Sequence, residues 1–331
     1  MTRALSWLQK NLVWSIPGAM LLGLLFGQLA NPGPLRWAIL PLTFLMVYPM
    51  MVTMNLKALL SPGGGRVQGT ALFINFVVMP AVGWGAGVVF FADQPAARLA
   101  LLLTALLPTS GMTISWTGFA KGNVPAAVKM TVLGLVAGSL LAPLYLQALL
   151  GAVVSIPVTQ VALQIGLIVF LPMALGHLTQ KWLVAQVGQA RFNSHTKLLF
   201  PPWSTLGVLG IVFVSMALKS HDIVQNPALL ATLLMPLALV YALNFALSTV
   251  VGRLFFERGD AIALVYGTVM RNLSIALAIA IGVFKDHGTE AALLIALAYV
   301  VQVQSAAWYV RLTDRLFGRV SSHQPTPEKI A

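Results

Sequence analysis

Cysteine is absent from the 331 residues, and charged residues make up only 8% of them. Without cysteine, disulfides, thiolate metal sites and cysteine nucleophiles are excluded. Hydrophobic residues reach 58% and the mean hydropathy is +0.87, so a single soluble core could not hide the apolar side chains. Composition therefore predicts a polytopic membrane protein. Its apolar runs of about 18 or more residues predict helices rather than the short alternating strands of a barrel.

Acidic residues are also scarce, with eight against twenty basic residues and a net charge of +12. The basic residues are spread over short connectors rather than gathered in one patch, which favours a role in membrane orientation over nucleic-acid binding. The five histidines show no metal-ligand spacing. We therefore expect no catalytic residue, no metal site and no cofactor, with a small solute and membrane lipid as partners. The sequence leaves the oligomeric state open.

Ten apolar spans are expected, with a few residues of error at each end. They lie near residues 12–30, 35–56, 67–92, 97–119, 124–150, 159–180, 200–218, 226–252, 259–284 and 287–310. Residues 1–315 are predicted to form one transmembrane domain, and the polar, proline-containing residues 316–331 a disordered cytoplasmic tail. The first residues, MTRALSWLQK, lack a small-residue cleavage site, so the first span is expected to be retained.

Lysine and arginine on alternate sides of the ten spans give fourteen on one side and four on the other. Such asymmetry places the richer side in the cytoplasm, together with both termini, and we expect a bacterial inner membrane. The four are Arg36, Arg98, Lys219 and Lys285. Only Lys129 and Arg271 fall inside spans.

Ten spans divide into five plus five, about residues 12–150 and 159–315, and an odd number in each half inverts the second half. Inverted repeats are typical of secondary transporters, in which discontinuous helices of the two halves meet at the midplane. The fourth and ninth spans correspond in this scheme, and both have polar centres. The expected solute-binding residues are Thr109, Ser110, Thr113, Thr268, Arg271, Asn272, Ser274 and Gln302.

Both polar centres have a plainer structural explanation. A proline-kinked helix whose serine and threonine side chains bond to its own carbonyls would account for the fourth span, which contains Pro108. Arg271 has about 12 residues on either side, some 18 Å of helix, and cannot reach an interface. Every carboxylate maps to a connector, a span end or the tail. Arg271 is therefore either a structural cap for free carbonyls or a fixed cation that attracts an anionic or polar solute.

Two segments carry a resemblance, namely PTSGMTISWTGFAKGNVPAAV (108–128) and TVMRNLSIALAIA (268–280). They resemble the two crossing helices of the bile acid:sodium symporter superfamily, and AKGNV (120–124) with RNLSIALA (271–278) is the most specific part. The stretch WTGFAKGN (116–123) is most similar to the arsenite-efflux, arsenical-resistance branch. The resemblance implies ten helices in a panel and a core domain, with a substrate cavity at the crossing of the fourth and ninth helices.

The chain departs from both branches at residues that the resemblance makes functional. The sodium ligands of the symporter branch correspond here to Thr113 with Ile114, Ala127 with Thr131, and Gly267 with Arg271. These positions lack the carboxylate, and a hard cation needs several oxygen ligands, so sodium coupling is not expected.

In the arsenite branch a cysteine and a glutamate correspond to Thr109 and Gln302. Thiolate capture of arsenite is thus excluded, while binding of its neutral hydroxide by hydroxyls and amides is not.

The expected function is secondary transport of a small anionic or polar solute, such as an organic anion or a metalloid oxyanion like arsenite, without a sodium requirement. The alternative is a sodium-coupled symporter of bile-acid-like organic anions. A membrane-embedded enzyme would need a nucleophile with a base or a metal cluster at one depth, and no histidine or carboxylate lies near the crossing. A sensor would bring a soluble domain, for which no connector is long enough.

Overall fold

The computed structural model describes residues 7–8, 11–55, 64–225 and 228–318, and the regular elements in these ranges are all helices. The α-helices are α2 Leu12–Leu29, α3 Ile39–Thr53, α4 Gly65–Phe73, α5 Met79–Phe90, α6 Pro95–Leu106, α7 Gly111–Phe119, α8 Val124–Leu150, α9 Val158–Ile165, α10 Leu171–Val187, α11 Gln189–Ser194, α12 Pro201–Leu218, α13 Ser220–Gln225, α14 Ala228–Phe255, α15 Arg258–Val269, α16 Leu273–Val283 and α17 Lys285–Phe317. Short 3-10 helices, η1 Gly33–Ala38 and η5 Thr196–Leu199, and π-helical turns, η3 Ile74–Val78 and η4 Gly166–Phe170, join some of them.

Eight helical segments in the described part of the chain are long and apolar enough to cross a membrane. Each corresponds to one of the ten predicted spans. The other two, 97–119 and 259–284, are each divided into two shorter helices, α6 with α7 and α15 with α16. A helix needs about 20 residues to cross the hydrocarbon core. Neither half of a divided span reaches this length alone, so these two predicted spans are not among the eight.

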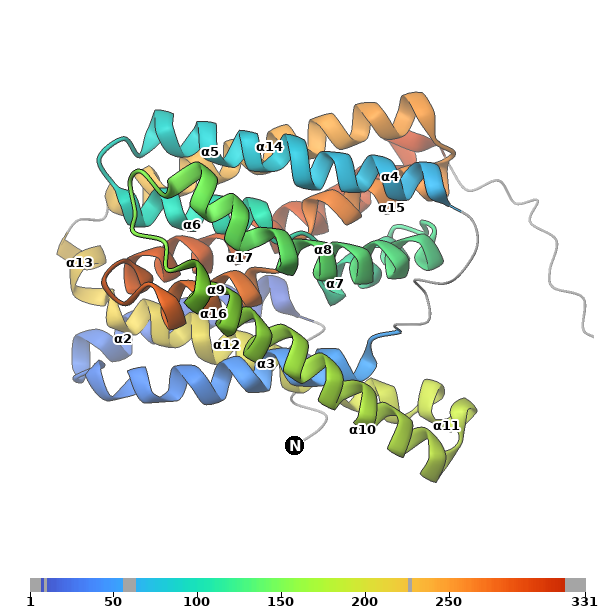
Figure 1. The fold of residues 1–331 in the computed structure, drawn as a ribbon, viewed down its shortest axis with the longest axis horizontal. Coiled ribbons are helices and arrows are strands. Elements are labelled where there is room, and N and C mark those ends of the chain that lie inside the picture. The colour runs from blue at the N-terminus through green and yellow to red at the C-terminus, as the bar shows by residue number, and fades with distance from the viewer. Residues whose placement is uncertain (1–6, 9–10, 56–63, 226–227, 319–331) are drawn as a thin grey trace, which may run out of the picture.

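The helices form two layers (Figure 1). In the panel layer, α12 packs against α2 and α3, and α3 packs against α10. The core layer comprises α4 to α8 and α14 to α17, with α5 against α6, α14 against α15, and α17 against α6, α14 and α16. The layers meet where α17 contacts α2 and α12 and where α16 contacts α3. The two divided spans therefore lie inside the core layer, close to its border with α3.

Large apolar side chains are exposed on the outer faces of the helices. Leu21, Leu25 and Leu29 on α2, and Met235 and Leu243 on α14, are examples. Contiguous apolar surface of this extent is costly in water but is stable against lipid tails. The distribution is that of an integral membrane protein.

The ends of several helices differ from the predicted ones. α8 occupies the predicted residues, whereas α17 begins at Lys285 and continues to Phe317, beyond the predicted end at 310 and two residues into the expected tail. Residue 318 is also described, whereas residues 319–331 of that tail and residues 1–6 and 9–10 of the first segment lie outside the described residues.

Two glycines one turn apart bring α2 close to α12. A Cβ atom on Gly23 would meet Met216 Cβ at 3.0 Å and the Phe213 carbonyl, and one on Gly27 would meet the Ala217 carbonyl of α12. Small residues spaced by four let helix backbones approach closely in membranes, where packing drives association. The panel layer therefore depends on this spacing.

We expect Gly23→Ala to lower the melting temperature of the purified protein, because the added methyl group forces α2 and α12 apart. Gly18→Ala is the matched control on the same helix, because a Cβ there has nothing within 4 Å. Thermal unfolding in detergent compares the two. Equal melting temperatures would contradict the proposed close contact.

Candidate functional site at the paired helix breaks

The break in the fourth span covers the four residues between α6 and α7. Pro108 has no N–H and disfavours a helical conformation at Leu107, so α6 ends at Leu106. Thr109 adopts a φ of +61°, which is unusual for a β-branched residue. Ser110 then caps α7, because its side chain accepts from Met112 N at 3.3 Å while its own N–H donates to Thr113 Oγ1 at 3.2 Å. The predicted break at this position is confirmed.

The ninth span breaks without a proline. α15 ends at Val269 and α16 begins at Leu273, with Asn272 as its cap. The Asn272 side chain accepts from Ile275 N at 3.3 Å, which is the bond that makes asparagine a favoured N-cap. The capping residue, rather than a helix breaker, is the sequence signal for this break.

The two breaks are bonded directly to each other. Thr109 N donates to the Met270 carbonyl at 2.7 Å, and Asn272 N donates to the Leu107 carbonyl at 2.7 Å, so Pro108 and Arg271 form an isolated antiparallel bridge. Backbone groups freed inside a membrane must find partners within the protein. The bridge supplies them and fixes where α6, α7, α15 and α16 meet.

Gln302 of α17 completes the bonding of the bridge. Its Oε1 accepts from Arg271 N at 2.7 Å and its Nε2 donates to the Arg271 carbonyl at 3.3 Å. Tyr241 of α14 donates its hydroxyl to the same Oε1 at 2.9 Å. The carboxamide therefore acts as a partner for the peptide groups of residue 271, a task that the sequence did not suggest.

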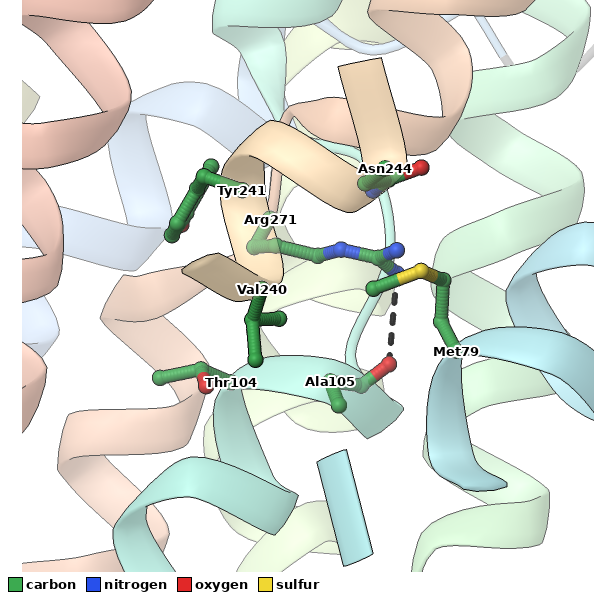
Figure 2. A pocket seen from close by; sticks show the side chains of 7 residues that line it. All are labelled: Met79, Thr104, Ala105, Val240, Tyr241, Asn244 and Arg271. Carbon is green, nitrogen blue, oxygen red and sulfur yellow. Dashed lines mark hydrogen bonds between the residues drawn. The ribbon is translucent and has the colours of Figure 1, made fainter. Parts of the chain in front are cut away.

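The Arg271 side chain is buried, at 3% exposure, and points toward α5, α6 and α14. Its Nη1 donates to the Ala105 carbonyl at 3.2 Å, whereas Nη2 has no hydrogen-bond partner among the described residues. Figure 2 shows the guanidinium extending between Met79 and Asn244, with the bond to Ala105 below it. A small cavity of about 10 Å³ lies beside it. The guanidinium has no acidic residue as a hydrogen-bond or ion-pair partner within the ranges described.

One of the predicted site residues, Ser274, lies toward α3 and away from the Arg271 guanidinium. Ser274 Oγ is 2.6 Å from the Tyr299 hydroxyl, which in turn approaches Met46 Sδ of α3 at 4.0 Å. Gly111, which follows Ser110, faces Met50 of α3, because its Cβ would lie 3.4 Å from Met50 Sδ. One face of the polar centres is thus directed toward the panel layer, whereas the Arg271 guanidinium is directed into the core layer.

The three threonines among the predicted site residues are engaged inside the core layer. Thr109 Oγ1 bonds to the Pro108 and Thr131 carbonyls at 2.7 and 3.1 Å. Thr113 is fully buried in the capping box of α7, and Thr268 Oγ1 is 2.7 Å from Ser248 Oγ. The Asn272 Nδ2 group is buried without a hydrogen-bond partner among the described residues. Of the eight predicted residues, Arg271 and Asn272 therefore have side-chain donors without a partner.

Sequence reasoning missed several residues around Arg271. Thr104, Tyr241 and Asn244 all line the cavity, and none of them is among the predicted solute-binding residues. Tyr241 lies three residues before Asn244 and so on the same face of α14, which is the signal that could have indicated both.

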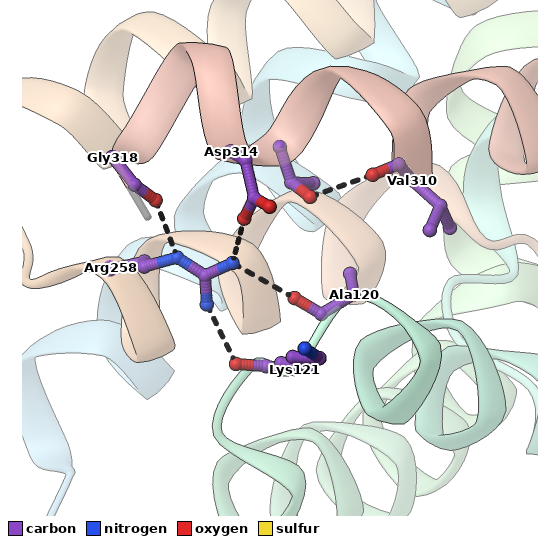
Figure 3. Close-up of polar contacts among 7 residues, drawn as sticks. Ala120, Lys121, Arg258, Val310, Asp314 and Gly318 are labelled. Carbon is purple, nitrogen blue, oxygen red and sulfur yellow. Dashed lines mark hydrogen bonds and ion pairs between the residues drawn. The ribbon is translucent and has the colours of Figure 1, made fainter. Parts of the chain in front are cut away.

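Arg258 holds the far ends of the two divided spans together (Figure 3). Its Nη1 donates to the Lys121 carbonyl at 2.9 Å, Nε to the Gly318 carbonyl at 2.8 Å, and Nη2 to Asp314 Oδ1 at 2.6 Å. Because Asp314 is exposed, its ion pair adds little stability, and the carbonyl bonds matter more.

The AKGN segment supplies the other half of this contact. Asn123 N donates to the Gly259 carbonyl at 2.9 Å, and Asn123 Nδ2 donates to Asp260 Oδ1 at 2.6 Å. A Cβ on Gly122 would lie 2.6 Å from Ile262 Cγ2, so the turn packs directly on α15. The α7–α8 turn and the start of α15 are thereby connected, and the two divided spans are joined at their ends as well as at their breaks.

Comparison with known proteins agrees with this arrangement. A model of the Sodium Bile acid symporter family matches residues 40–226, which is more than half of the chain and includes the α6–α7 break. The arsenical-resistance protein Acr3 of Corynebacterium glutamicum is 22% identical over 240 residues, covering 68% of this chain. The alignment spans only 64% of that relative's length. Because the family match covers more than half of the residues, the chain belongs to the sodium bile acid symporter family.

Proposed function

We propose that the chain is a secondary transporter of a small anionic or polar solute, without enzymatic activity. The observation that carries the proposal is the pair of bonded helix breaks with a buried, incompletely bonded arginine between them. Broken helices are tolerated in a membrane only where protein or a water-filled cavity satisfies the freed backbone groups, and intramembrane charges are functional by default. Membership of the family supports the same activity.

We further propose the ten-span architecture with two inverted halves, in which α6 with α7 is the fourth span and α15 with α16 the ninth. The eight continuous spans and the two divided ones support that count. In Figure 1, the α7–α8 connection and α11 lie at one end and the α5–α6 connection and α13 at the other. The first end carries more of the basic residues, so it is assigned to the cytoplasm, with both termini. Residues 1–315 then form one transporter domain in the inner membrane.

The solute is proposed to bind between the bridge and α3. The N-termini of α7 and α16 both begin at the bridge, where their free N–H groups and dipoles favour negative charge or polar oxygens. Ser110, Asn272 and Ser274 are the proposed direct contacts, and Arg271 is the fixed positive charge. Thr109, Thr113, Thr268 and Gln302 complete the site by holding the two breaks in position.

Two solute classes are compatible with this chemistry. The relative named as an arsenical-resistance protein favours arsenite, which would be bound by hydroxyls and amides because the chain has no cysteine. The guanidinium and the helix N-termini favour an organic anion instead. Flux of both classes into proteoliposomes that contain the purified protein tests the proposal, with protein-free liposomes as the control. If neither class crosses faster than in the control under ion or pH gradients, the transporter proposal is wrong.

We expect transport to proceed equally in sodium and in choline buffer. Gly267 provides no side-chain oxygen, its carbonyl already accepts from Asn75 Nδ2 at 2.9 Å, and Met130 Sδ fills the space beside it. A sodium ion needs several free oxygen ligands, which this position no longer offers. Initial uptake rates in the two buffers give the answer. A steep sodium dependence would favour the alternative of a sodium-coupled symporter of organic anions.

A further inference from the structure

The cavity beside Arg271 lies behind the bridge, on the side away from α3. Its lining comes from α5, α6 and α14 together with Arg271, and no panel-layer residue contributes. The lining residues are Met79, Thr104, Ala105, Val240, Tyr241, Asn244 and Arg271. Its volume of about 10 Å³ is roughly the room that one water needs. An oxyanion or an organic solute is too large for it.

Most polar groups of the lining already have partners. Thr104 Oγ1 donates to the Leu101 carbonyl at 2.7 Å, and Asn244 Nδ2 donates to the Thr268 carbonyl at 2.8 Å, which leaves one N–H of that amide. Arg271 Nη2 is buried and without a partner among the described residues. The hydroxyl oxygens of Thr104 and Tyr241 can still accept a hydrogen bond, but each already has a partner, so the lining atom left without any partner among the described residues is a donor that carries a positive charge.

A buried and incompletely bonded charge is unfavourable unless a charge of opposite sign compensates it. A water molecule would satisfy an N–H group but would leave the positive charge in place. A single-atom anion satisfies both needs and fits the space. We propose that this cavity binds one small monovalent inorganic anion of the halide class, with chloride as the natural ligand, contacted by Arg271 Nη2 and the free N–H of Asn244.

This site is distinct from the proposed solute position, since the bridge separates the two, and it does not depend on which solute is transported. One guanidinium supplies positive charge to both sides. We therefore expect chloride to weaken the binding of an anionic solute and to leave that of a neutral solute unchanged.

Chloride binding can be measured on the purified full chain in gluconate buffer, without any transported solute. Chloride and bromide are titrated at constant ionic strength while the melting temperature and the heat of binding are followed, with gluconate as the anion that is too large to enter. We expect saturable stabilisation by both halides. Arg271→Gln should abolish it, whereas Arg98→Gln should not, because Arg98 bonds to the Phe91 and Ala92 carbonyls outside the cavity.

Val240→Leu keeps Arg271 and its bonds but fills part of the cavity. It therefore tests the cavity independently, in case Arg271→Gln loses chloride binding through misfolding. We expect it to weaken chloride binding by about tenfold or more, the effect of losing a good contact to a buried charge. Equal responses to chloride and gluconate would mean that the cavity holds only water and would overturn the proposal. Undiminished chloride binding in Val240→Leu and Arg271→Gln would place the ion elsewhere and overturn it as well.

Discussion

Arg271→Gln is expected to fold, to melt no lower than the parent protein and to lose its affinity for anionic solutes. Within the described part of the chain the side chain makes one hydrogen bond, to the Ala105 carbonyl, while the bridge is formed by backbone groups that glutamine retains. Removing a buried charge that lacks an acidic partner relieves a desolvation cost. The guanidinium acts on an anionic solute across the bridge by its charge, which at an effective dielectric constant of about 20 and a separation of about 8–10 Å amounts to about 2 kcal/mol, so the affinity for an anionic solute should fall by roughly ten- to thirtyfold.

The measurement is a ligand-shifted melting curve in gluconate buffer, where no halide competes for the guanidinium. Matched anionic and neutral solutes are compared on the parent protein, Arg271→Gln and the control Arg98→Gln. If Arg271→Gln melts lower yet keeps the same ligand-induced shift, Arg271 is a structural cap for the Ala105 carbonyl and has no part in binding. Retention of the shift in Arg271→Lys would indicate simple charge attraction, because lysine lacks the planar donor fork.

The helices could be predicted from the sequence because the signals for them are local. Apolar runs of the right length gave the spans, and Val124–Leu150 coincides with the predicted span. The breaks were also predictable, since Pro108 and the polar cluster around Arg271 interrupt otherwise apolar runs. The π-helical turns Ile74–Val78 and Gly166–Phe170 were not foreseen. Each turn ends two residues before a proline, Pro80 or Pro172, which removes an N–H from the helix ladder and is the local signal that could have indicated it.

The direction of each side chain was much harder to predict than its depth. Residues on one helix share a face because of the 3.6-residue period. After a break of three or four residues, that period no longer predicts which way a side chain points. Ser274 and Arg271 are only three residues apart, yet one faces Tyr299 and Met46 and the other faces the core cavity. Gln302 lies at the expected depth and in contact with the site, but it bonds to a peptide group rather than pointing into a solute cavity.

Close packing of α8 on the first break explains why Gly134 tolerates no side chain. A Cβ there would lie 2.5 Å from Thr109 Oγ1 and 3.1 Å from Thr109 Cγ2. Thr109 cannot retreat, because its N–H bonds to the Met270 carbonyl and its φ of +61° is held by that bond. A side chain at 134 must therefore turn the Thr109 side chain away from its bonds to the Pro108 and Thr131 carbonyls or shift the bridge itself.

We expect Gly134→Ala to destabilise the protein by about 1–3 kcal/mol, the usual cost of overpacking, and to abolish transport because the two breaks separate. Gly85→Ala on α5 is the matched control, since a Cβ there has nothing within 4 Å and alanine is the better helix former. Thr109→Gly removes the clashing side chain and suits the positive φ, so the double variant should be more stable than the sum of the two single changes predicts. Thermal unfolding and proteoliposome flux are measured for all four variants. The two single variants Gly134→Ala and Thr109→Gly, together with their double variant, form a double-mutant cycle. Strict additivity would show that α8 does not press on Thr109, and the bridge would then be independent of α8.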